Sequence, residues 1–71
     1  MKRLSGSKIT DLSHGDKIKV VWKNSTDYGE VFIKNYLSQH PWVRWENGET
    51  DSLEMIEKYE SIGHCEVYQI D

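Results

Sequence analysis

Hydrophobic and polar residues alternate along several stretches of the chain, and this period of two predicts β-strands. The clearest stretch begins at Lys17, where Ile18, Val20 and Trp22 share one face and lysines occupy the other. The same alternation, with β-branched and aromatic residues, predicts four further strands at residues 29–34, 41–45, 50–53 and 65–70.

A hairpin lies at the centre of the stretch from Pro41 to Ile56. Pro41 suits the start of a strand, because proline cannot donate a ladder hydrogen bond. The dipeptide Asn47-Gly48 follows Trp45, and it predicts a type I′ turn, since both central residues of that turn need φ > 0.

The period changes after the hairpin and predicts a helix over residues 52–60. Asp51 or Ser52 is suited to cap it, and Gly63 to end it. Four apolar side chains are expected on its buried side: Leu53, Met55, Ile56 and Tyr59.

Four strands, a short helix and a last strand predict a fold that is mainly β with one short helix, most simply a five-stranded, partly open barrel. Residues 1–71 form one domain. Residues 1–14 are expected to be an N-terminal extension or an extra strand, with Ser7–Leu12 either forming that strand or packing over the end of the barrel. In the loop Asn35–His40, Tyr36 and Leu37 are expected to fold back onto the core.

The chain carries a net charge of −3, distributed unevenly. Residues 1–34 contain seven basic and four acidic side chains, whereas residues 35–71 contain two basic and eight acidic ones. Such a dipolar surface can steer a charged partner, although two ordinary solvated faces give the same pattern.

The sequence carries no signal for catalysis, a cofactor or a membrane. No apolar run approaches the roughly 20 residues of a membrane span, and no apolar segment follows the basic N-terminus. A cytoplasmic protein with the single thiol of Cys65 is expected. Adjacent residues of a strand point to opposite faces, so His64 and Cys65 do not predict a catalytic pair. No CxxC or HxxxH spacing brings metal ligands together, and no metal site or small-molecule substrate is expected.

The chain resembles the Tudor and wider SH3-like barrel class over residues 15–60. The matching residues are Gly15-Asp16-Lys17, the strand that ends at Trp22, Tyr28, Val31–Ile33, Val43-Arg44-Trp45, Asn47-Gly48-Glu49 and the helical turn at Ile56. The loop at 35–40 and the helix near 52–60 depart from the simplest form of that pattern. The resemblance implies an aromatic cage for methylated arginine or lysine, formed by Trp22, Tyr28 and Trp45 with Asn47 as a polar neighbour. Alternatively, these rings fill the core.

A non-enzymatic module that binds a protein partner is the first functional hypothesis. Its contacts would come from an aromatic and acidic face made of Trp42, Arg44, Glu46, Glu49, Glu54 and Glu57. A single small barrel is also similar to the compact accessory proteins that phages and mobile elements use, so a regulator or inhibitor of a host enzyme is one form of this hypothesis.

Nucleic-acid binding is the alternative hypothesis. Lysines gather on two neighbouring predicted strands, and Trp42 or Tyr36 could offer a stacking ring. The lysines are Lys17, Lys19, Lys23 and Lys34. The acidic second half of the chain would repel a long duplex.

Overall fold

The computed structural model describes residues 1–33 and 40–70. Those residues form six strands and two helices. In chain order they are β1 (Lys2–Leu4), α1 (Ser7–Thr10), β2 (Lys17–Trp22), β3 (Thr26–Ile33), β4 (Pro41–Trp45), β5 (Thr50–Ser52), α2 (Leu53–Ser61) and β6 (Cys65–Ile70). The expected contacts of Tyr36 and Leu37 lie outside the described residues.

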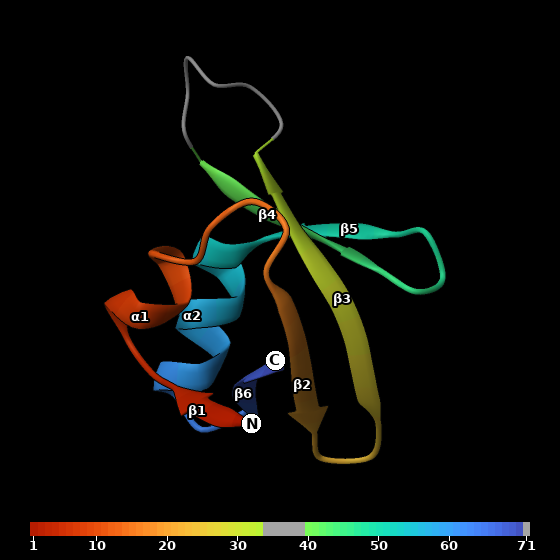
Figure 1. The fold of residues 1–71 in the computed structure, drawn as a ribbon. Helices are drawn as coiled ribbons and strands as arrows, with labels where there is room; N and C mark the ends of the chain where they lie inside the picture. The colour runs from red at the N-terminus through yellow and green to blue at the C-terminus, as the bar shows by residue number, and fades with distance from the viewer. Residues whose placement is uncertain (34–39, 71) are drawn as a thin grey trace.

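All six strands belong to one sheet, in the order β1-β6-β2-β3-β4-β5, and every neighbouring pair is antiparallel (Figure 1). β1 and β5 are its edges and do not pair with each other, so the sheet is open. The prediction of a mainly β fold with one short helix is confirmed. The predicted five strands become six, and closure into a barrel is not confirmed.

The N-terminal residues form a strand at Lys2–Leu4 and a helical turn at residues 7–10, so the first of the two alternatives for Ser7–Leu12, a strand, is not formed. β1 pairs with β6 along Leu4↔Val67, and residues 7–10 form α1, which packs against α2 (Figure 1). Ile9 and Leu12 are both buried. Their spacing of three residues places them on one side of a helical turn.

The hairpin turn differs from the predicted type I′ by one residue. The N–H of Gly48 donates to the carbonyl of Trp45 at 2.9 Å, so Glu46 and Asn47 are the central residues of the turn. Gly48 follows with φ 91°, and Trp45 N–H donates to Glu49 O at 2.8 Å. A three-residue loop with glycine at its left-handed position is the next most common hairpin after the two-residue type.

The predicted helix is confirmed as α2, and Ser52 rather than Asp51 caps it. The Ser52 side chain accepts a hydrogen bond from Met55 N–H at 3.2 Å. Leu53 and Ile56 are buried, but Met55 is 44% exposed, contrary to the prediction. Two residues correspond to about 200° around a helix, so Met55 cannot share a narrow stripe with Leu53.

α2 ends where Gly63 was predicted to stop it. Gly63 has φ 83°, its N–H donates to Glu60 O at 3.0 Å, and His64 N–H donates to Tyr59 O at 2.9 Å. This pair of hydrogen bonds is a Schellman motif, which glycine favours because it adopts positive φ without strain. The motif turns the chain directly into β6.

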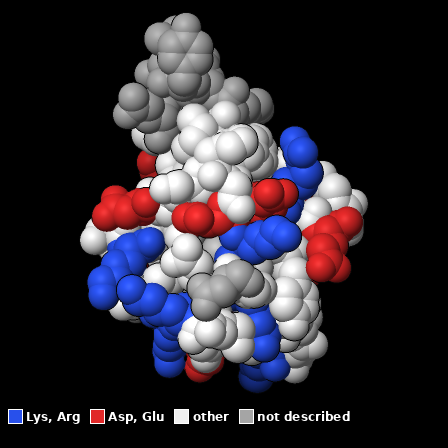
Figure 2. Space-filling view, viewed as in Figure 1, with Lys and Arg blue, Asp and Glu red and all other residues white. Residues whose placement is uncertain are grey.

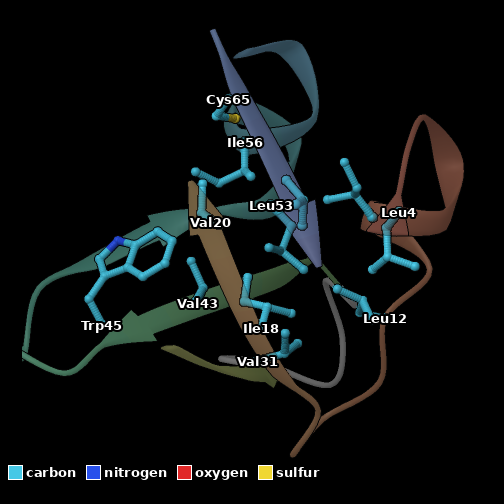
Figure 3. Close-up of a cluster of buried hydrophobic side chains, with 12 residues drawn as sticks. Leu4, Leu12, Ile18, Val20, Val31, Val43, Trp45, Leu53, Ile56 and Cys65 are labelled. Carbon is cyan, nitrogen blue, oxygen red and sulfur yellow. The ribbon is translucent and has the colours of Figure 1, made fainter. Parts of the chain in front are cut away.

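The core lies between the helices and one face of the sheet (Figure 3). The strands contribute Ile18, Val20, Val31, Val43 and Val67, all with no exposed surface. Leu53 and Ile56 of α2 pack against them, with Trp45 at one end and Leu4 and Leu12 at the other. Ile18 and Val20, which the alternation placed on one face of β2, are buried in this core, and Trp22 of the same face is partly buried.

Candidate binding surface on the outer face of the sheet

The second face of the sheet is covered by neither described helix. We call it the outer face. It carries the side chains that alternate with the core residues and share their cross-strand register. They are Arg3, Lys17, Lys19, Val21, Thr26, Tyr28, Glu30, Phe32, Trp42, Arg44, Glu66, Tyr68 and Ile70. None of them is fully buried.

One cross-strand row of this face alternates cations with phenol rings. Arg3 lies opposite Tyr68, Tyr68 opposite Lys19, and Lys19 opposite Tyr28, so the row crosses β1, β6, β2 and β3. Residues directly opposite one another have Cβ atoms roughly 4.5–5.5 Å apart. The row therefore forms a continuous strip of basic and aromatic groups.

The adjacent row alternates charges. Lys17 lies opposite Glu30 and Glu30 opposite Arg44, with Ile70 at the β6 end. The guanidinium carbon of Arg44 lies 4.9 Å from the centre of the Phe32 ring, a cation–π distance. Beside the second row is a hollow of about 500 Å³, whose lining includes Lys17 and Arg44 and, from the first row, Tyr28.

Glu66 fixes one end of the first row. Its carboxylate accepts a hydrogen bond from the Tyr68 hydroxyl at 2.6 Å and lies 3.9 Å from the Arg3 guanidinium. The hydrogen bond to Glu66 raises the pKa of the Tyr68 phenol, because losing the proton would break the bond and place two anions together. The hydrogen bond to Glu66 therefore holds the Tyr68 ring in place.

The lysines predicted from the sequence are only partly brought together. Lys17 and Lys19 are neighbours on the outer face of β2. Lys23 lies beyond the end of β2, in the turn toward β3, and Lys34 lies outside the described residues.

The predicted aromatic and acidic face is divided between two sides of the molecule. Trp42 and Arg44 lie on the outer face, while Glu46 and Glu49 belong to the β4–β5 turn. The remaining two acids, Glu54 and Glu57, are on α2, which packs on the inner face, and Glu54 lies 3.0 Å from His40 Nδ1.

The four residues of the predicted cage do not face a common site. Trp45 is buried in the core and its Nε1 donates to Asp51 at 2.6 Å. Trp22 packs edge-on against Tyr59 at 5.7 Å, whereas Tyr28 points to the outer face. Asn47 uses its side-chain oxygen within the hairpin turn, to accept from Glu49 N–H.

A second hollow, of about 780 Å³, lies beside the β2–β3 turn. Trp22, Tyr59 and His64 line it, together with Cys65. Tyr59 and His64 are nearly parallel, with ring centres 6.4 Å apart. Burial raises the pKa of the Cys65 thiol, and the charge of Glu60 raises it further, so this cysteine is poorly suited to act as a nucleophile at neutral pH.

Sequence reasoning missed Arg3, Tyr68 and Phe32 as members of this surface. The alternation of Tyr68 and Ile70 with Val67 marks their phase in β6, but only strand pairing shows that β6 lies next to β2. Arg3 was missed because no strand was predicted at Lys2–Leu4.

Within the described part of the chain, no three His, Cys, Asp or Glu side chains are grouped closely enough to hold one metal ion. No described helix is long and apolar enough to cross a membrane. The sequence matches no protein-family model and no curated protein, and the fold matches no solved structure.

Proposed function

We propose that this protein binds nucleic acid on the outer face of its sheet. The row of Arg3, Tyr68, Lys19 and Tyr28 is the observation that carries the proposal. In such a row, basic side chains bind the phosphate backbone while the aromatic rings between them stack on the bases.

The distribution of charge supports this choice of face. Among its described residues the outer face has four basic side chains and two acidic ones, although the whole chain has a net charge of −3. The acidic residues of α2 lie on the other side of the sheet. Figure 2 shows that basic and acidic side chains are interspersed on the side of the molecule in view.

The proposal is tested by comparing two pairs of lysines. Lys17→Gln/Lys19→Gln removes two cations from the outer face, and Lys8→Gln/Lys58→Gln removes two from the helices. We expect the first pair to weaken binding of labelled oligonucleotides about 10-fold at low salt, because each lost phosphate contact weakens the electrostatic attraction. The second pair should bind like the unmodified protein.

Fluorescence anisotropy measures the affinities, and urea unfolding checks that both variants remain folded. Absence of binding to any oligonucleotide at low salt would overturn the proposal, and so would an equal loss in the two pairs.

A protein partner is the second candidate, and one observation favours α2 as its site. Met55 and Ile62 are 44% and 64% exposed and lie about two helical turns apart, with Lys58 between them on the same side of α2. Exposed apolar side chains on one side of a helix suit a partner segment that is apolar.

The test for this partner is affinity capture from host lysate with quantitative mass spectrometry. Met55→Ser/Ile62→Ser should lose a captured protein that Lys17→Gln/Lys19→Gln retains. If every captured protein is retained by the α2 variant, this surface is not the binding site.

For the fold, the SH3-like class stays a proposal. The order β6-β2-β3-β4-β5, with α2 between β5 and β6, supports it. We do not extend the proposal to a reader of methylated residues, because Tyr28 lies on the opposite face from Trp22 and Trp45.

A further inference from the structure

We propose that the nucleic acid bound by the outer face is single-stranded, with one unpaired base stacked on Tyr28 and another on Tyr68. This inference rests on the proposed function and names its substrate class.

The two tyrosines are placed as a pair of stacking platforms. Both lie opposite Lys19, from its two sides, so they are two strand spacings apart, roughly 10 Å. Tyr28 is the most exposed aromatic side chain of the described residues, at 42%. Lys19 stands between the two rings, where a phosphate that links successive nucleotides would pass.

Several other aromatic side chains of the described residues make contacts within the protein. Trp45 is buried, Trp22 packs against Tyr59, and the Phe32 ring is faced by the Arg44 guanidinium. The Tyr68 hydroxyl is held by Glu66 at 2.6 Å, which fixes the direction of its ring. A fixed ring loses little conformational freedom when a base stacks on it.

The same face is poorly suited to a duplex. An α-helix or a two-stranded ribbon reads the major groove of DNA, and here both described helices lie on the other side of the sheet (Figure 1). The bases of a duplex are stacked on one another, so their faces are closed to tyrosine. A single strand offers those faces freely.

Acidic side chains limit how many phosphates the face can hold. Glu30 lies between Lys17 and Arg44, and Glu66 lies beside Arg3. Lys17, Lys19 and Arg44 remain as phosphate contacts. Three contacts with a single strand give a slope of about −2 for the logarithm of affinity against the logarithm of salt concentration.

The experiment uses labelled oligodeoxythymidylate, oligouridylate and a DNA hairpin of equal charge, with the intact protein. We expect both single strands to bind at least about 10-fold more tightly than the hairpin, because only they expose base faces. Comparing the two single strands identifies whether DNA or RNA is preferred.

Matched substitutions test the rings. Tyr28→Leu and Tyr68→Leu should each weaken single-strand binding about 5- to 100-fold, because the stacking surface is lost. Tyr28→Phe and Tyr68→Phe keep the ring and should bind within about 3-fold of the unmodified protein. Tyr68→Phe also separates the role of the ring from that of the hydrogen bond to Glu66.

The outcomes separate this inference from the proposed function. If the protein binds the hairpin as tightly as the single strands, or if the leucine variants bind normally, the inference is overturned while nucleic-acid binding stands. If none of the three probes binds, the proposed function itself fails, and this inference fails with it.

Discussion

Gly29 occupies a position in β3 that leaves no room for a side chain. It pairs with Trp45, whose ring lies over it. A Cβ atom at this position would be 2.5 Å from Val43 Cγ2, 2.8 Å from the Arg44 carbonyl oxygen and 2.9 Å from Trp45 Cε3. Glycine in a strand often marks such a close approach. Here it lets Trp45 enter the core and lets β4 lie flat against β3.

Gly29→Ala should therefore lower the free energy of unfolding by about 1–3 kcal/mol, because the backbone or the Trp45 ring must shift to accept the methyl group. Urea unfolding followed by tryptophan fluorescence measures the change. Gly48→Asn is the control, since nothing lies within 4 Å of a Cβ atom at Gly48 and asparagine tolerates its positive φ better than other residues. An unchanged midpoint for Gly29→Ala would contradict the packing described for Trp45.

At the scale of elements, α2 depends on the cap at its first turn. Ser52 ends β5 and also caps α2, so one residue joins the strand to the helix. Glu54 in the first turn adds a favourable interaction with the helix dipole. The sequence predicted this element well, because caps and helical periodicity depend on residues within one or two turns of each other.

Ser52→Ala should lower the free energy of unfolding by about 1 kcal/mol, because Met55 N–H loses its acceptor. Ser52→Asn restores an acceptor oxygen and should recover most of the loss. Chemical denaturation monitored by circular dichroism at 222 nm reports both variants. Equal stability of the serine, alanine and asparagine proteins would show that the cap does not stabilise α2.

The elements that were predicted wrongly or missed from the sequence were so for identifiable physical reasons. The hairpin dipeptide Asn47-Gly48 fits both a two-residue and a three-residue loop, and the choice depends on how Trp45 pairs with Glu49. Residues 7–12 have too few apolar positions to distinguish a period of two from a helical turn. β1 has only three residues and forms because β6 offers it an edge.

At the scale of the whole molecule, one face of the sheet packs in the core and the other is covered by neither described helix. The helices cover the inner face, and the three-residue strands β1 and β5 form the two edges of the open sheet. Short edges offer little backbone for unwanted strand pairing. The outer face and the exposed side of α2 are the two surfaces to which the proposed functions assign a partner.

The amino-acid sequence by itself determined the type of most elements and the phase of the buried residues in the central strands. These features depend on local periodicity, caps and turn residues. Only the tertiary structure decided which strands are neighbours, because pairing between β6 and β2 joins residues far apart in the chain. Together with β1–β6 and β2–β3, that pairing places Arg3, Tyr68, Lys19 and Tyr28 in one row. The packing of α2 on the inner face places Glu54 on the opposite side of the sheet from Trp42.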